Sequence, residues 1–434
     1  MTHRVRLSLI LSMLLLVCGF GSQLPATADQ DNSPVLPILP VVGSTAPIPS
    51  TSGLRTVLDP LIRKPALGSS AVWVADPATG ATLLESHAQL ALSPASTLKL
   101  LTAATALNTL GASTRLATRA VSDGSTVTLI GGGDATLPSK GPGASLAELA
   151  VKTAKAVGDG SINLVYDISL FSGRTLGAGW SPSFPAAGVV APVQSLMMDQ
   201  GRANPKGNSR VANPAQYAAQ AFARLLRAKG VKVGSVTKGK ATADAVEIAR
   251  VESAPVQQLV HHMLTDSDND LAESLAHLSG AKLSGVGSFA SGEQAMTAVA
   301  STLELPTVGM ALSDGSGLSS RDRVSAQTLG SILLLSAQGS FGGIAPALAI
   351  AAFTGTLADR FTSALQADAA GFVRAKTGTL NDVVTLAGIV PDVDGRVLVF
   401  AVLANEVPSI VGARKVVDQI ATKLRSCGCT EAKP

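Results

Sequence analysis

A buried helix carrying a serine and a lysine is predicted by Leu92-Ser-Pro-Ala-Ser96-Thr-Leu-Lys99-Leu-Leu-Thr-Ala-Ala-Thr-Ala-Leu107. Pro94 suits the first turn of a helix, and Gly111 stands where the helix would end. Ser96 therefore opens the helix, and Lys99, almost one turn later, lies on the same face. The other side chains are nearly all Leu, Ala or Thr, so burial is expected nearly all round. A lysine there is costly unless it is paired, neutral or functional.

The Ser-x-x-Lys pattern alone is weak, because Ser235 to Lys238 and Ser279 to Lys282 also fit it. Only Ser96 begins an apolar helix. Only Ser96 is followed by both Ser267-Asp268-Asn269 and Lys376-Thr377-Gly378. The joint occurrence of these three motifs in this order makes the signal strong, and it is the signature of penicillin-recognising serine hydrolases.

The three motifs together predict nucleophilic catalysis without a Ser-His-Asp triad. A serine hydroxyl is a poor nucleophile until a base removes its proton. Lys99 can act as that base only while it is neutral, and both burial and the nearby cation Lys376 should lower its pKa. We expect Ser267 to relay a proton between Lys99 and the leaving amine, and Asn269 to bind the substrate amide or Lys99.

The third motif is suited to a terminal carboxylate. Lys376 supplies a cation, Thr377 and Thr379 supply hydroxyl groups, and Gly378 lets a substrate backbone approach the strand closely. The backbone N–H groups of Ser96 and Thr379 are candidates for an oxyanion hole. A separate cluster of histidines, His261, His262 and His277, matches no metal-binding spacing, so we expect neither a metal nor a cofactor.

Composition excludes some classes of function. Hydrophobic residues make up 46% of the 434 residues but aromatics only 3%, so the core must be built from Ala, Val and Leu. So few aromatics argue against a stacking surface for nucleic acid. Arg4 and Arg6 precede an apolar run from Leu7 to Phe20 and then Ala26-Thr-Ala28. We therefore interpret 1–28 as a secretory signal peptide and the protein as secreted and extracytoplasmic, in the periplasm or cell wall.

Removal of that leader lowers Lys+Arg from 34 to 32 against 30 Asp+Glu, which leaves no electrostatic case for nucleic acid. Residues 29–53 are rich in Pro, Ser and Thr and read as an extended linker, giving at most a peripheral association with membrane or wall. Residues 427–434 form a tail in which Cys427 and Cys429 either pair in a strained ring or cross-link elsewhere.

The hydrophobic pattern predicts an α+β fold. About five strands form an antiparallel sheet, with helices before and after it. The expected strands are Ser70–Asp76, Ala81–Ser86, Phe372–Lys376, Val383–Val390 and Arg396–Leu403, followed by a closing helix Ser409–Arg425. Two further helices, Ala254–Leu264 and Asp270–Leu278, would leave Ser267 and Asn269 on the loop between them.

The interval between the first two motifs is too long for one helix and a loop, since 267 − 96 = 171 positions separate Ser96 from Ser267. Short β-branched runs and a helical stretch from Pro214 to Lys229 predict an inserted α+β domain at 119–250. The catalytic domain would then comprise 54–118 and 251–426, and we expect the insert to be independent of the catalytic machinery.

The chain resembles the low-molecular-mass class C penicillin-binding proteins, a family of D-alanyl-D-alanine carboxypeptidases and endopeptidases. Besides the three motifs, the resemblance rests on Gly131–Leu137, Asp167 with Phe171, Gly179-Trp180, Ala191-Pro192, Ser267–Glu273, Asp314–Ser319 and Phe353–Leu357. It covers nearly all of the mature chain. The chain departs from the family pattern in two respects. The interval between Ser96 and Ser267 is shorter than in members with two inserted domains, and Val190 stands where the family usually has Tyr.

The resemblance implies a penicillin-recognising serine hydrolase (β-lactamase/transpeptidase-like) domain acting on peptidoglycan stem peptides that end in D-Ala-D-Ala, with β-lactams as inhibitors. Ser96 would form the acyl-enzyme and water would resolve it. A β-lactamase is the alternative, but it needs a glutamate that activates water, and Glu273, Glu293 and Glu304 lack the expected context. A non-enzymatic β-lactam sensor is a further alternative, which would tolerate the loss of a catalytic residue, and none is lost.

Overall fold

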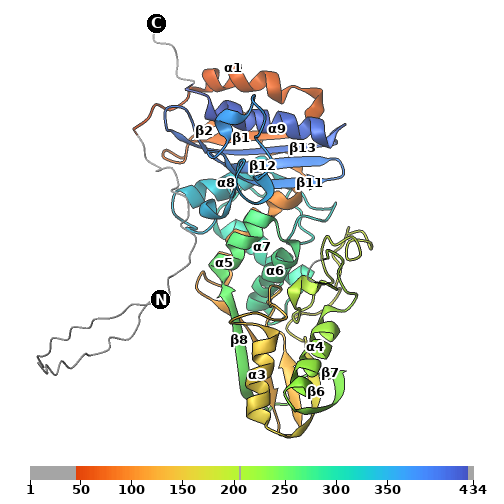
Figure 1. The fold of residues 1–434 in the computed structure, drawn as a ribbon. Helices are drawn as coiled ribbons and strands as arrows, with labels where there is room; N and C mark the ends of the chain where they lie inside the picture. Colours follow the sequence, from red (N-terminus) through yellow and green to blue (C-terminus); the bar gives the residue numbers. More distant parts are fainter. Residues whose placement is uncertain (1–44, 205–206, 429–434) are drawn as a thin grey trace, which may run out of the picture. The chain divides into compact units, whose positions relative to one another are not determined.

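The computed structural model describes residues 45–204 and 207–428 (Figure 1). The predicted signal peptide and most of the predicted linker lie outside these residues. Within them, no helix has both the length and the apolar character needed to cross a membrane.

Six antiparallel strands form the principal sheet, in the order β10-β11-β12-β13-β1-β2. Their bounds are β1 Ser69–Ala75, β2 Thr82–Ser86, β10 Ala349–Ile350, β11 Arg374–Leu380, β12 Val383–Pro391 and β13 Val397–Asn405. Five of them correspond to expected strands. The sixth, β10, corrects the expected count, and its two residues are too few to show a periodicity.

Both faces of the sheet are buried at its central strands, which explains why β12 and β13 are apolar at nearly every position. In β1, Ala71 and Trp73 face one core and Val72 and Val74 face the other. Helices α1 (Thr51–Ile62) and α9 (Ile410–Arg425) cover the second face, where they lie together in Figure 1. The opposite face packs against α8 (Ala326–Ala337).

A group of helices builds the rest of the first core and carries two of the three motifs. It contains α2 (Lys99–Thr109), α5 (Val256–Asp266), α6 (Asn269–Ser284) and α7 (Phe289–Thr302). Helix α2 contacts α5, α6, α7 and α8. Eight of its eleven residues are buried, including Lys99, as the sequence predicts.

A second, mixed sheet of five strands has the order β7-β6-β5-β4-β8. Its elements are β4 Arg115–Ser122, β5 Thr126–Ile130, α3 Leu146–Val157, β6 Ser161–Asp167, α4 Pro214–Ala228, β7 Lys232–Lys238 and β8 Val246–Pro255. It has a core of its own. Its first and last strands along the chain, β4 and β8, extend beyond 119 and 250, while the insert boundaries themselves stay a prediction. A two-stranded ribbon pairs β3 (Ala91–Leu92) with β9 (Val324–Ser325).

Three local features differ from expectation. Helix α1 begins at Thr51, so the last three residues of the predicted linker are helical; Ser50 caps it by accepting from the Gly53 N–H at 3.0 Å. Ser96 lies in a 3₁₀ turn, Ala95–Leu98, and the α-helix proper begins only at Lys99. Cys427 is buried and disulfide-bonded, and Cys429 lies outside the described residues.

Candidate active site

Ser96 stands on a sharp turn between β3 and α2. The residue before it, Ala95, has a φ of 45°, a left-handed conformation that is unusual for a residue with a side chain. The 3₁₀ turn that follows places Lys99 beneath the serine, and the Lys99 Nζ donates to the Ser96 Oγ at 2.9 Å. The predicted pairing of the first motif is therefore present, with Lys99 fully buried.

Lys99 has two further partners that hold its amine in place. It donates to the Asn269 Oδ1 at 2.7 Å and to the Ser316 carbonyl at 2.7 Å. Asn269 is the first residue of α6, and its Nδ2 donates to the Val189 carbonyl at 2.9 Å. Of the two partners expected for Asn269, the described structure contains Lys99.

Ser267 lies at the C-terminal cap of α5 with a left-handed backbone, φ 61° and ψ 38°. Its hydroxyl accepts a hydrogen bond of 2.8 Å from the Lys376 Nζ, which joins the second motif to the third. Lys376 also donates to the Thr377 carbonyl at 2.8 Å and is fully buried. Each of the two lysines thus holds one serine hydroxyl.

Strand β11 lies directly against the serine turn because Gly378 has no side chain. A Cβ at this position would lie 2.1 Å from the Thr385 Oγ1, 2.8 Å from the Pro94 carbonyl oxygen and 3.0 Å from the Ser96 N. Thr385 itself donates to that Pro94 carbonyl at 2.9 Å. The close approach brings the N–H of Ser96 to the strand that carries Thr379, as an oxyanion hole made by these two residues requires.

Burial controls the charge state of both lysines. Desolvation lowers the pKa of Lys99 to about 8, although the carboxyl groups of Asp314 and Glu273 act in the opposite direction. At this pKa about a tenth of Lys99 is neutral at pH 7. Desolvation and then the charge of Lys99 hold the pKa of Lys376 well below its ordinary value. Burial is the largest cause of the lowered Lys99 pKa, as expected, and the charge repulsion between the two lysines acts in the same direction.

Two buried carboxyl groups, which sequence reasoning did not assign to the site, hold the loop that contacts Lys99. Glu273 accepts from the backbone N–H of Ser316 at 2.8 Å and of Gly315 at 3.1 Å. Asp314 accepts from the N–H groups of Gly317 and Ser319, at 2.6 and 2.7 Å, and from the Trp180 indole. Together they fix the loop whose Ser316 carbonyl holds Lys99. In the sequence this loop stands out only as the Asp314–Ser319 part of the family resemblance, which does not indicate its partner.

Residues from the range predicted as the insert also reach the site. Besides the Val189 carbonyl on Asn269, the Ala191 N–H donates to Asp270 at 2.6 Å, and Arg210 forms a buried ion pair with Asp270 at 2.9 Å. The loop that contains Val190 is thus held against the start of α6. These contacts differ from the expectation that the insert is independent of the catalytic machinery.

A cavity of about 800 Å³ opens beside Thr379. Its walls carry hydroxyl, amide and apolar side chains, with Arg323 as a cation and Asp382 and Glu406 as carboxylates. They also include Leu92, Ser93, Phe184, Val189, Leu318, Ser320, Asn381 and Asn405. Thr377 lies deeper, and its hydroxyl donates to the Thr356 hydroxyl at 2.8 Å. The cavity is large enough for a peptide segment of a few residues.

The three histidines singled out in the sequence have separate surroundings. His277 is buried, with its Nδ1 2.8 Å from the Glu273 carbonyl oxygen, and burial lowers its pKa to about 4. His261 contacts Thr265, and His262 contacts Asp266 and Asp268. No group of three or more His, Cys, Asp or Glu arranged to hold a metal ion occurs in the described ranges.

Comparison with known proteins shows one consistent relationship. A family model described as the D-Ala-D-Ala carboxypeptidase 3 (S13) family matches residues 54–209 and 203–425. Carboxypeptidase Rv3627c of Mycobacterium tuberculosis is 35% identical over 94% of this chain and 91% of its own length. Carboxypeptidase DacB of Mycolicibacterium smegmatis is 37% identical over 93% of this chain and 89% of its own.

The fold is also found among solved structures. Penicillin binding protein 4 from Haemophilus influenzae matches with a TM-score of 0.72 and 21% identity, over 87% of this chain and 98% of that one. Its complex with a novel β-lactam matches with a TM-score of 0.67 and 21% identity, over 86% and 99%. The six-stranded sheet and its helices are therefore the fold of a penicillin-recognising serine hydrolase.

Proposed function

The chain belongs to the D-Ala-D-Ala carboxypeptidase 3 (S13) family and is a serine-type DD-peptidase, and we propose that it acts through an acyl-enzyme on Ser96. The observation that carries this assignment is the hydrogen bond of 2.9 Å between the fully buried Lys99 amine and the Ser96 hydroxyl. A neutral amine at that distance can accept the hydroxyl proton as the serine attacks.

The contacts of Ser96, Lys99 and Ser267 support the following proposed reaction. Ser96 attacks the carbonyl of the penultimate D-Ala while Lys99 takes its proton. The N–H groups of Ser96 and Thr379 stabilise the oxyanion. Ser267 passes a proton to the leaving amine, D-Ala departs, and water then hydrolyses the ester. The Lys376 contact with Ser267 supports this relay, because it keeps the hydroxyl oriented toward the buried lysines.

The substrate proposed is a peptidoglycan stem peptide that ends in D-Ala-D-Ala. Lys376, Thr377 and Thr379 would bind its terminal carboxylate. Gly378 serves the close packing of β11 on the serine turn, and not, as expected from the sequence, the approach of a substrate backbone. The cavity beside Thr379 would take the preceding residues. Endopeptidase cleavage of cross-linked peptides uses the same bond type and is proposed as a second activity of this site.

We propose that β-lactams acylate the same serine and are released slowly. A β-lactamase needs a carboxylate that activates water for fast deacylation. Glu273 is fully buried and already accepts two backbone N–H groups, while Glu293 and Glu304 are exposed on the helix α7 region. These surroundings favour a long-lived penicilloyl adduct over turnover of the antibiotic.

The localisation proposed is outside the cytoplasm, after cleavage of a signal peptide at 1–28. The 29–53 segment would hold the folded part of the chain away from the membrane or wall. The stem peptide is an extracytoplasmic polymer component, and this supports secretion. We also retain 119–250 as a proposed inserted domain within a catalytic domain of 54–118 and 251–426.

The function is tested by mixing the purified protein with a peptide ending in D-Ala-D-Ala and, separately, with labelled penicillin. We expect release of free D-Ala, and a stable adduct that peptide mapping locates on Ser96. Rapid penicillin turnover without D-Ala release would instead establish the β-lactamase alternative.

A further inference from the structure

The hydroxyl of Ser267 depends on a strained turn for its position. The left-handed backbone of Ser267, φ 61° and ψ 38°, is disfavoured for a residue with a Cβ and persists only where neighbouring contacts hold it. The turn is short, because α5 ends at Asp266 and α6 begins at Asn269. Whatever fixes this turn also fixes the contact of 2.8 Å between Ser267 and Lys376.

One imidazole bridges the two residues that flank Ser267. The His262 Nδ1 lies 2.9 Å from the Asp266 Oδ2, and its Nε2 lies 3.1 Å from the Asp268 Oδ2. A neutral imidazole has a single N–H and can donate to only one carboxylate, whereas the imidazolium donates to both. The complete bridge across Ser267 therefore requires the protonated ring.

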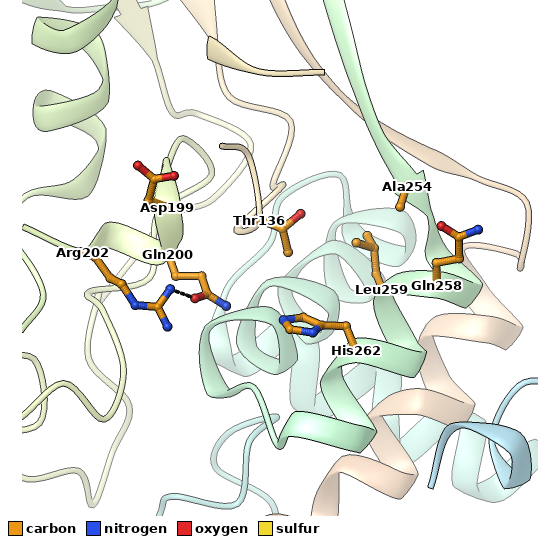
Figure 2. A pocket seen from close by; sticks show the side chains of 8 residues that line it. All are labelled: Thr136, Asp199, Gln200, Arg202, Ala254, Gln258, Leu259 and His262. Carbon is orange, nitrogen blue, oxygen red and sulfur yellow. Dashed lines mark hydrogen bonds between the residues drawn. The ribbon is translucent and has the colours of Figure 1, made fainter. Parts of the chain in front are cut away.

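Two further hydrogen bonds hold the Asp268 side chain in place. Its Oδ1 accepts from the Leu271 N–H at 2.9 Å, which caps α6, and its Oδ2 accepts from the Gln200 amide. Arg202 in turn donates to Gln200, the contact drawn in Figure 2. The Asp268 side chain is only 6% exposed, so its charge is poorly hydrated and depends on these donors.

His262 is open to solvent on its remaining side. Its side chain is 44% exposed and, with Gln200 and Arg202, lines a hollow of about 460 Å³. Figure 2 shows these three side chains among those that line it. Protons can therefore exchange with bulk water without opening the fold. The ring therefore lies between solvent and the Asp266–Asn269 segment, and it contacts this segment through Asp266 and Asp268.

We propose that His262 is a positioning residue for the DD-peptidase reaction, whose imidazolium bridges Asp266 and Asp268 and so holds the Ser267 hydroxyl in place. The proposal rests on the roles given above to Ser267 and Lys376. Nothing in the mechanism requires His262 to touch the substrate.

The charged surroundings give the pH dependence its sign. Asp266 and Asp268 face the ring directly, His261 precedes it on α5, and Asp199 and Arg202 line the same hollow. The hydrogen bond with Asp268 is the main cause that raises the pKa of His262 above its ordinary 6.5. The bridge is thus complete in acid and is lost as pH rises through that raised pKa.

The test compares His262→Gln with the matched variant His261→Gln. Rates of acylation by labelled penicillin and of D-Ala release are measured from pH 5.5 to 9, together with the melting temperature. We expect His262→Gln to be slower than wild type by about tenfold near pH 6 and to converge with it at alkaline pH. His261→Gln should match wild type throughout. A deficit of His262→Gln that is equal at every pH, or no deficit, would overturn the proposal.

A second variant guards against misfolding of the first. Asp266→Asn changes a side chain that is 53% exposed and removes the negative charge at one end of the bridge. The pKa of His262 should then be lower, so the pH at which the bridge is lost should also be lower. A profile identical to wild type would count against the bridge. If wild type itself takes no label on Ser96, the proposed function fails. If it is labelled normally and the variants show no pH-dependent deficit, only the role of His262 fails.

Discussion

Lys376 donates a hydrogen bond of 2.8 Å to the hydroxyl of Ser267, a residue 109 positions earlier in the chain. This contact joins the third motif to the second, while Lys99 joins the second to the first through Asn269 and Ser96. Two buried lysines therefore hold the polar groups of the site in two hydrogen-bonded sets, which the backbone between Ser267 and Asn269 joins.

The charge state of Lys99 should set the pH dependence of acylation. Its pKa is lowered to about 8 and its neutral form is the base, so in His262→Gln, which lacks the titrating bridge across Ser267, the acylation rate should rise with pH and level off above about pH 8. Lys99→Arg, always charged, should lose about a hundredfold or more. Stopped-flow measurement with a chromogenic β-lactam checks both. A rate independent of pH between 6 and 9, or normal acylation of the Arg variant, contradicts the role.

Ser96→Ala should abolish both the penicillin adduct and D-Ala release, because the nucleophile is gone, while leaving the melting temperature nearly unchanged. Ser235→Ala is the matched control, since Ser235 begins another Ser-x-x-Lys but is exposed on β7. Mass spectrometry of the labelled proteins distinguishes them. An adduct that persists in Ser96→Ala places the nucleophile elsewhere.

Gly378→Ala should impair catalysis through geometry alone. The new Cβ would lie 2.1 Å from the Thr385 Oγ1 and 3.0 Å from the Ser96 N, so β11 or the serine turn must move. We expect a loss of about 1–3 kcal/mol in the free energy of unfolding. We also expect an acylation rate about a hundredfold lower, from misplacement of Ser96.

Gly342→Ala is the control for that change, because a Cβ at Gly342 has open space around it. Denaturant unfolding and acylation are measured for both variants. Equal behaviour of the two would mean that the close approach of β11 to Ser96 is not needed.

Glu273→Ala should destabilise the protein by about 2–4 kcal/mol, because the N–H groups of Gly315 and Ser316 lose their buried acceptor. Acylation should fall with it, since the Ser316 carbonyl holds Lys99. Glu273→Gln keeps an acceptor oxygen and should retain most of both properties. Urea unfolding of the two variants makes the comparison, and equal losses would exclude the acceptor role.

The same residue predicts a pH effect on stability. Burial and Asp314 raise the pKa of Glu273 from 4.5 to about 8, so the unfolded chain releases the proton first as pH rises. Its contribution to stability is therefore full below about pH 4.5 and is lost toward pH 8. In Glu273→Gln this loss should disappear. Melting temperatures of wild type and variant at pH 5 and pH 8 test it, and parallel changes contradict it.

Much of the fold was accessible from local pattern. The helix after Ser96, five of the six strands of the principal sheet and the closing helix follow from apolar runs and turn residues, and such signals are contained in short windows. The two-residue strand β10 was missed because its pairing with β11 is decided by tertiary contact. The 3₁₀ turn at Ala95–Leu98 was missed because the strain at Ala95 has no sequence signal.

The sequence by itself determined which chemistry the chain carries, because two serines, two lysines, an asparagine and a glycine must occupy fixed positions in three short motifs. Only the tertiary structure decided what supports them. The Glu273 carboxyl acts indirectly, by accepting from the Ser316 N–H. The Ser316 carbonyl accepts from Lys99 and the Val189 carbonyl accepts from Asn269, and both act through backbone atoms that every residue possesses. Such groups have no residue-type signature. Their positions, and the burial that lowers the pKa of Lys99, follow from how the helices, the sheet and the 189–210 segment pack together.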